Sequence, residues 1–224
     1  MHPLIAGLKG KLIVSVQAYP GEPMRHPETM AQIARAAEIG GAAAIRCQGL
    51  SDISAIKGRV DVPVIGLWKE GHEGVYITPS LRHARACVMV GADIVALDAT
   101  GRPRLDGRSF AETVAALREE ETLVMADCGS FEDAQRAVDA GVDIVSTTLA
   151  GYTGDRPKTD GPDLELLEQT VQAFPGVPVI CEGRIHTPEH AAAAMKLGAF
   201  AVIVGTAITH PTSVTGWFKA AVEG

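Results

Sequence analysis

Two charged residues directly follow short apolar runs, and their types suit proton-transfer chemistry. Lys69 follows the run 62–68, and Glu182 follows the run 177–181; in each run proline is the second residue. Apolar runs of this length, bounded by turn signals, predict buried parallel strands. A charge at the end of such a strand does not serve packing, because burying it costs several kcal/mol unless it is paired. Parallel strands end at one edge of a sheet, so we expect this amine and carboxylate to share a site there.

The other predicted strands also end in residues that suit a site. In chain order, the strand ends carry Gln17, Arg46, Lys69, Asp98, Asp127, Thr147 with Thr148, Glu182 with Gly183 and Arg184, and Gly205 with Thr206. Lys69 should have a lowered pKa, because desolvation and the nearby charge of Arg46 both disfavour the ammonium. Such an amine suits a proton shuttle or a Schiff base. Alternatively, Lys69 pairs with Glu182 or Asp127 only to close the mouth of the sheet.

The remaining polar ends have their own candidate roles. Glu182 either holds Lys69 or exchanges a proton on the opposite face of a substrate. Asp98 and Asp127 contact sugar hydroxyls, act as acid or base, or cap the loops that follow them. Arg46 suits a carboxylate or a phosphate, and Gln17 suits a hydroxyl or an amide.

The seventh and eighth strand ends predict a phosphate site. Gly183 with Arg184 and Gly205 with Thr206 occupy the two adjacent loops where barrels often hold phosphate. Glycine allows backbone N–H groups to approach the oxygen atoms, and a helix N-terminus adds a favourable dipole.

A repeated pattern predicts the fold. Gly41, Gly91, Gly141 and Gly198 each follow an alanine-rich segment and precede an apolar run, at spacings of 50, 50 and 57 residues. This pattern is typical of a helix that ends at glycine and leads into a strand. With the runs between them, it predicts eight strands alternating with helices, a (β/α)8 TIM barrel formed by residues 1–224 as one domain. The alternative, a doubly wound sheet, needs a glycine-rich fingerprint after the first strand, and residues 15–19 (SVQAY) lack it.

Local signals locate helix starts and one long loop. Thr78-Pro79 and Thr187-Pro188 predict an N-cap followed by proline, and Ser130 with Asp133 predicts a weaker start. Residues 151–162, rich in glycine and proline, predict a mobile lid or rim loop after the sixth strand.

Composition excludes several classes of protein. The net charge of −7 gives no support for nucleic-acid binding. No basic and apolar leader opens the sequence, and no apolar run reaches the ~18 residues of a membrane span. We therefore expect a cytoplasmic protein with no membrane role. The oligomeric state is open, with a homodimer as the candidate.

Cysteines and histidines show no metal or disulfide pattern. The four cysteines (Cys47, Cys87, Cys128 and Cys181) have no CxxC spacing, so we expect reduced core residues rather than a catalytic thiol at Cys128 or Cys181. No metal-binding histidine motif occurs. We expect His2, His26, His83 and His190 at the surface. His72, His186 and His210 fall on rim loops, and their roles are left open.

These residues resemble one known family, the N-acetylmannosamine-6-phosphate 2-epimerases of bacterial sialic-acid catabolism. The resemblance covers nearly the whole chain, and its specific segments are residues 66–69 (GLWK), 147–153 (TTLAGYT) and 182–185 (EGRI). It implies an isomerase that interconverts N-acetylmannosamine 6-phosphate and N-acetylglucosamine 6-phosphate, with no metal or organic cofactor.

The resemblance also assigns roles to residues. It implies that Lys69 and Glu182 are the catalytic pair. It implies substrate binding by a second set, Gln17, Arg46, Asp127, Thr147 and Thr148, and phosphate binding by a third, Gly183, Arg184, Gly205, Thr206 and His210.

Two positions depart from the family pattern. The family commonly has arginine where His210 stands, and histidine binds phosphate fully only when protonated, so we expect affinity to weaken above about pH 6.5. Residues 128–130 are Cys-Gly-Ser where the family usually has Ile-Ser-Thr, which changes the fifth loop.

The chemistry needs an acid–base site and an anchor. The C2 hydrogen of an acetamido sugar is acidic only when C1 is a carbonyl, so the open-chain aldehyde must react. Our hypothesis is that Lys69 exchanges the C2 proton, Glu182 supports it or serves the opposite face, and Arg46 with Gln17 stabilises the enolate. The phosphate then supplies orienting energy. The alternatives are a lysine-dependent aldolase or lyase that forms an imine, and a sugar-phosphate-binding barrel without catalysis.

Overall fold

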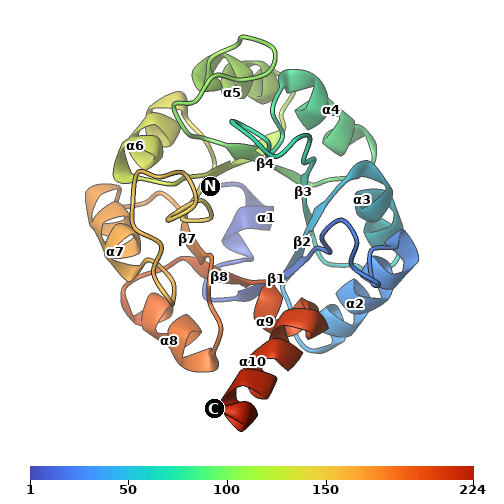
Figure 1. Ribbon diagram of the computed structural model, residues 1–224. Helices are drawn as coiled ribbons and strands as arrows, with labels where there is room; N and C mark the ends of the chain where they lie inside the picture. Colours follow the sequence, from blue (N-terminus) through green and yellow to red (C-terminus); the bar gives the residue numbers. More distant parts are fainter.

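A closed barrel of parallel strands forms the centre of the computed structural model, which describes residues 1–224 (Figure 1). The strands are β1 (Leu12–Val16), β2 (Ala44–Gln48), β3 (Val64–Leu67), β4 (Ile94–Asp98), β5 (Leu123–Asp127), β6 (Ile144–Ser146), β7 (Val179–Glu182) and β8 (Ala201–Val204). Each strand pairs with the next, and β8 pairs with β1 to close the ring. The predicted (β/α)8 barrel is confirmed.

Helices surround this barrel and close one of its ends. They are α1 (Pro3–Ala6), α2 (Pro27–Ile39), α3 (Leu50–Lys57), α4 (Leu81–Met89), α5 (Phe110–Glu119), α6 (Phe131–Ala140), α7 (Leu164–Ala173), α8 (Pro188–Lys196), α9 (Thr206–Thr209) and α10 (Pro211–Glu223). In Figure 1, α2 to α8 form the outer ring, α1 lies at the centre and α10 extends outward. None of the helices combines the length and the apolarity that a membrane crossing requires.

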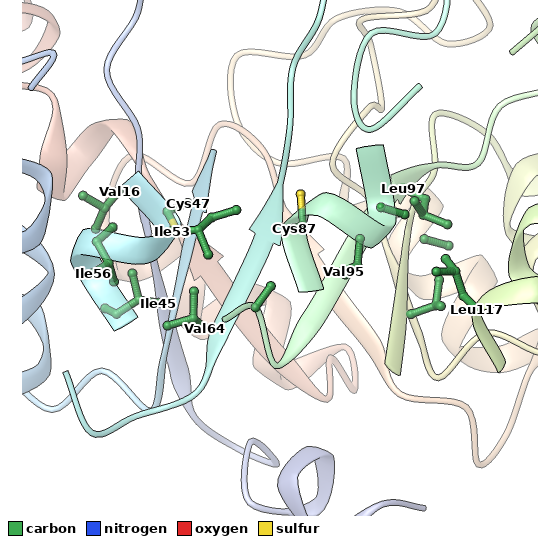
Figure 2. Packing of buried hydrophobic residues seen from close by; sticks show 14 of the residues in the cluster. Val16, Ile45, Cys47, Ile53, Ile56, Val64, Cys87, Val95, Leu97 and Leu117 are labelled. Atoms are coloured by element: carbon green, nitrogen blue, oxygen red, sulfur yellow. The ribbon is translucent and has the colours of Figure 1, made fainter. Parts of the chain in front are cut away.

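Strand alternation separates two parts of the core. Along β4, Val95 and Leu97 belong to the layer between barrel and helices (Figure 2). The alternate residues Ile94 and Ala96 belong to the cluster inside the barrel. Ile5 and Leu8 from the α1 region join the inner cluster. Apolar side chains therefore fill the interior of the barrel on the side of α1. The next inward position on β4 is the polar Asp98, at the carboxyl end of the strand.

The expected helix ends are mostly confirmed. Gly41, Gly91, Gly141 and Gly198 all have positive φ (100°, 108°, 79° and 92°), which glycine adopts without strain. Thr187 caps α8, and Ser130 with Asp133 forms a full capping box on α6.

The helix start predicted at Thr78-Pro79 is wrong. Helix α4 begins at Leu81 after Ser80. Thr78 instead has a φ of 47°, its N–H donates to Trp68 O at 2.8 Å, and its hydroxyl donates to Ala96 O at 2.7 Å. These tertiary hydrogen bonds outweigh the local capping signal and keep Thr78 outside the helix.

Loop 151–162 is anchored at several points. Arg184 donates to Ala150 O at 2.7 Å, to Gly161 O at 3.0 Å and to Thr159 Oγ1 at 3.0 Å. Arg156 in the loop donates to Asp163 at 2.6 and 3.0 Å. The predicted rim loop is therefore tied to the loop that follows β7.

Candidate active site

A cavity of about 320 Å³ opens at the carboxyl ends of the strands. Among the predicted site residues, those that line it are Gln17, Arg46, Lys69, Thr148, Glu182, Gly183, Arg184, Gly205, Thr206 and His210. Three polar strand-end residues do not line it, namely Asp98, Asp127 and Thr147. The carboxyl end of the barrel therefore carries the concave, polar site that barrel architecture predicts.

Arg46 joins two carboxylates across the barrel. Its Nη1 and Nη2 lie 2.8 and 2.6 Å from the two Asp127 oxygens, and Nη1 lies 2.7 Å from Glu182 Oε2. The side chains of Arg46 and Asp127 are 1% and 0% exposed. The bidentate pair neutralises Asp127 and leaves Glu182 as the excess negative charge. Arg46 is thus held by two carboxylates at the wall of the cavity.

The two threonines after β6 lie in different environments. Thr148 Oγ1 lies 2.8 Å from Asp127 Oδ1 and 2.9 Å from Glu182 Oε2, so one hydroxyl contacts both carboxylates. Thr147 instead donates to Glu182 O at 2.9 Å and accepts from Glu182 N at 3.1 Å. Thr147 therefore fixes the backbone of the glutamate and does not face the cavity, which departs from its predicted place among substrate contacts.

Lys69 faces the cavity without a carboxylate partner. Its Nζ donates to Gln17 Oε1 at 2.8 Å, and Gln17 Nε2 donates to Ser15 Oγ at 2.9 Å. Desolvation and the Arg46 charge lower the pKa of Lys69 to about 8. The alternative in which Lys69 closes the barrel mouth through an ion pair is wrong, because the carboxylates named for it bind Arg46. Both ends of the Gln17 carboxamide therefore have partners within the protein.

Glu182 has an environment that favours its protonated form. Burial, opposed in part by Arg46, raises its pKa to about 7, and the Asp127 charge acts in the same direction as burial. Thr148 has only one hydroxyl proton to share between two carboxylates, so a proton on Glu182 relieves the contact. The cavity therefore holds an amine and a carboxylic acid that both titrate near neutral pH.

At the predicted phosphate end, the backbone turns sharply and Arg184 is hydrogen-bonded within the protein. Gly183 and Arg184 have positive φ (102° and 54°), which turns the backbone sharply after β7. The Arg184 guanidinium lines the cavity and also donates hydrogen bonds to Ala150, Thr159 and Gly161, which tie loop 151–162 to this end. His210 lines the cavity with a buried Nε2 that has no hydrogen-bond partner and lies 3.4 Å from Glu22 Oε1.

Three tyrosines at the mouth were missed by the sequence reasoning. Tyr19, Tyr76 and Tyr152, which are all the tyrosines in the chain, line the cavity. Tyr19 packs edge-on against His210 with ring centroids 5.4 Å apart, and the cations of Lys158 and Arg184 each lie 5.1 Å from the centroid of the Tyr152 ring. The sequence did offer a signal for them, because all three tyrosines occur in segments that follow predicted strand ends.

The remaining candidates have structural environments. Asp98 accepts hydrogen bonds from the N–H and hydroxyl of Thr100 at 2.9 and 2.6 Å, so it caps the loop that follows it, which is one of its predicted roles. All four cysteines are free and buried, as expected, and burial raises the pKa of Cys181 to about 12. The structure contains no group of three or more histidine, cysteine or acidic side chains that could hold a metal ion.

The prediction of a surface position for His83 is wrong. Its side chain is 0% exposed, with one ring nitrogen 2.5 Å from Glu70 Oε2 and the other 2.6 Å from Ser80 Oγ. The tertiary partners, which lie on the segment after β3 and at the start of α4, were not visible in the helix pattern. His2 and His26, by contrast, are exposed helix caps.

Comparison with known proteins bears on this site. Residues 30–224 match the family model described as "Putative N-acetylmannosamine-6-phosphate epimerase". The chain belongs to this epimerase family. The resemblance inferred from the residues is therefore confirmed.

Relatives of the epimerase family cover almost the whole chain. Proteins named "Putative N-acetylmannosamine-6-phosphate 2-epimerase" include one from Cutibacterium acnes, 64% identical over 98% of this chain and 97% of its own length. Another, from Corynebacterium glutamicum, is 51% identical over 97% of this chain and 95% of its own.

One solved structure supports the same assignment, and another shares only the fold. The N-acetylmannosamine-6-phosphate 2-epimerase from Clostridium perfringens superposes with a TM-score of 0.94 at 40% identity, over 98% of this chain and 96% of that one. A thiamine phosphate pyrophosphorylase from Pyrococcus furiosus shares the fold alone, with a TM-score of 0.62 at 20% identity, over 91% of this chain and 88% of its own. Fold, family and a site with acid–base groups thus agree on an isomerase.

Proposed function

We propose that this chain interconverts N-acetylmannosamine 6-phosphate and N-acetylglucosamine 6-phosphate by removing and returning the proton at C2. Family membership supports the substrate class. The observation that carries the proposal is the pairing, in one cavity, of an amine free of carboxylates and a glutamate held by Arg46. The open-chain aldehyde is the reacting form, because C2 is acidic only next to a carbonyl.

The proton transfers need one base and one acid. With a pKa of about 8, Lys69 has a neutral fraction at neutral pH that accepts the C2 proton. Glu182, with a pKa of about 7, retains a proton in part of the population and delivers it on the opposite face. In the reverse direction the two groups exchange roles. This scheme assigns Glu182 the face that the sequence hypothesis left open.

The surrounding residues position this pair. Arg46 and Thr148 fix the carboxyl of Glu182, and Gln17 fixes the amine of Lys69. Arg46 and Gln17, engaged in this way, act on the enolate through Glu182 and Lys69 in this proposal. Asp127 holds Arg46, and Thr147 holds the Glu182 backbone.

The phosphate group binds at the other end of the cavity. Backbone N–H groups around Gly183 and Gly205, the Thr206 hydroxyl and His210 are the proposed contacts. At Gly205 an added Cβ would lie 3.3 Å from Ser15 Cβ, so glycine keeps the loop close to β1. Arg184 contributes by fixing loop 151–162 beside this site.

The reaction is tested by incubating the protein with N-acetylmannosamine 6-phosphate in D2O and following C1 and C2 by proton NMR. We expect N-acetylglucosamine 6-phosphate with deuterium at C2. Product that fully retains the original C2 hydrogen would exclude proton transfer. Borohydride added during turnover should trap nothing on Lys69; a covalent adduct would favour the imine-forming lyase. Lys69→Met and Glu182→Gln should each abolish turnover and remain folded.

A homodimer is the proposed assembly. Helix α10 has no buried residue, and it exposes Trp217, Phe218 and Val222 (39%, 71% and 84% exposed). Apolar side chains clustered on a projecting helix support contact with a second copy. Size-exclusion chromatography with light scattering should give a dimer mass, and Phe218→Ser with Val222→Ser should give a monomer. A monomeric wild-type chain would contradict this assembly.

The proposed compartment is the cytoplasm, and residues 1–224 are proposed to act as one domain. Four unpaired cysteines fit a reducing compartment. Fractionation of expressing cells should recover the activity with cytoplasmic markers.

A further inference from the structure

The segment after β3 that carries Lys69 folds into a hairpin. Lys69 and Ile77 form an antiparallel bridge, Glu70 N donates to Tyr76 O at 3.0 Å, and Thr78 N donates to Trp68 O at 2.8 Å. The tip contains Gly71 and Gly74 with positive φ (76° and 60°). The lysine therefore lies on one arm of a hairpin whose other arm lines the cavity at Tyr76 and Ile77.

A buried histidine from α4 contacts both neighbours of Lys69. The His83 ring lies 4.4 Å from the Trp68 ring between centroids, and its Nε2 lies 2.5 Å from Glu70 Oε2. Its Nδ1 lies 2.6 Å from Ser80 Oγ. Both ring nitrogens are thus engaged, and the ring orientation is fixed from three sides.

We propose that His83 and Glu70 form a positioning pair that sets the place of Lys69 in the cavity. The inference rests on the proposed role of Lys69 as the base. The far end of Lys69 is held by Gln17 at 2.8 Å, and the hairpin clamped by His83 holds its backbone. A base must meet its proton within hydrogen-bond reach, and displacement of about 1 Å costs up to ~100-fold in rate.

A hydrolytic role for the same residues is less consistent with the structure. Ser80, His83 and Glu70 are linked in the order of a serine–histidine–acid triad. Ser80, however, is only 4% exposed, and its hydroxyl lies at the start of α4, where it provides no side-chain cap. The serine therefore serves as the second anchor of the imidazole. Arg82, 3.9 Å from Glu70 and 5.7 Å from the Trp68 ring, is the other charge near this pair.

The test compares variants that remove the clamp with variants that retain it. Glu70→Ala removes the acceptor, Glu70→Gln keeps one, and His83→Phe keeps the ring on Trp68 but loses both hydrogen bonds. We expect Glu70→Ala and His83→Phe to lower kcat at least tenfold with KM within twofold, while Glu70→Gln retains most of kcat. The double variant should lose no more than the worse single variant, because the two residues act as one unit. Arg85→Ala, on the same helix but bound to Glu120, is the matched control.

A second readout separates positioning from stability. When the clamp is lost, water reaches Lys69 and its pKa rises from about 8 toward the ordinary value, so the limb of kcat/KM assigned to Lys69 should move to higher pH. If folded His83→Phe shows a lower melting temperature but wild-type kcat and pH profile, the pair is only structural and the inference fails. A failure of the proposed role of Lys69 itself gives a different result. In that case the Lys69→Met variant would still incorporate deuterium at C2 of the sugar at the wild-type rate.

Discussion

The amine of Lys69 lies 2.8 Å from the carboxamide oxygen of Gln17. A neutral acceptor orients the amine without stabilising its charge, whereas a carboxylate in the same place would raise its pKa by about 1–3 units. The chemistry of Lys69 thus depends on the absence of charge at position 17.

Gln17→Glu tests this relationship. The new carboxylate should keep Lys69 protonated and lower kcat/KM at pH 7 by about tenfold or more relative to the wild type, and this deficit should shrink as pH rises toward 10. Gln17→Met, which removes the hydrogen bond without adding charge, should leave the pH profile in place while lowering the rate. A pH profile of Gln17→Glu that matches the wild type would contradict the role of the neutral acceptor.

The pH dependence of the wild-type enzyme follows from two groups. The base form of Lys69 is gained as pH rises through about 8, and the acid form of Glu182 is lost as pH rises through about 7. The product of the two fractions is largest between these values, so kcat/KM should follow a bell with its maximum between pH 7 and 8. Rates measured from pH 5 to 10 check this, and a plateau across the range would exclude the pair.

Lys69→Met should stabilise the fold as it removes activity. Folding lowers the pKa of Lys69 from its ordinary value of 10.5 to about 8, so the folded state disfavours the charged amine. The resulting destabilisation is complete below pH 8 and disappears as pH rises toward 10.5. We expect a gain of ~2 kcal/mol in unfolding free energy at pH 6.5 and little gain at pH 10, measured in urea. A loss of stability at pH 6.5 would show that the packing of the aliphatic part of the Lys69 side chain outweighs the cost of burying its charge.

Substitutions at position 210 test the phosphate end. His210→Arg supplies a permanent charge and should lower KM several-fold at pH 8 with kcat nearly unchanged, because the phosphate is remote from C2. His210→Ala should raise KM. If KM is the same in all three proteins at pH 8, His210 does not contact phosphate, and its pairing with Glu22 at 3.4 Å is structural.

Much of this architecture is readable from the sequence because parallel strands in a barrel carry long apolar runs. The glycines at 41, 91, 141 and 198 marked the helix-to-strand turns, and the charged residues after the runs marked the mouth. These are local signals, repeated along the chain.

The sequence could not indicate which side chains pair across the barrel. Arg46 lies 81 positions before Asp127 and 136 positions before Glu182. No local sequence pattern therefore indicates the salt bridges between them. For the same reason the hydrogen bonds of Arg184 to loop 151–162 were not predicted, and His83 was predicted at the surface although Glu70 and Ser80 hold it inside.

The contact of Arg46 with Asp127 and Glu182 links activity to the assembly of the barrel. It brings together side chains from β2, β5 and β7, and β7 is among the last strands in the chain. Before those strands have closed into the ring, Glu182 lacks the guanidinium that orients it. Turnover during refolding would therefore report the assembly of β2, β5 and β7, and a chain in which these strands have not yet assembled would be inactive even with its secondary structure in place.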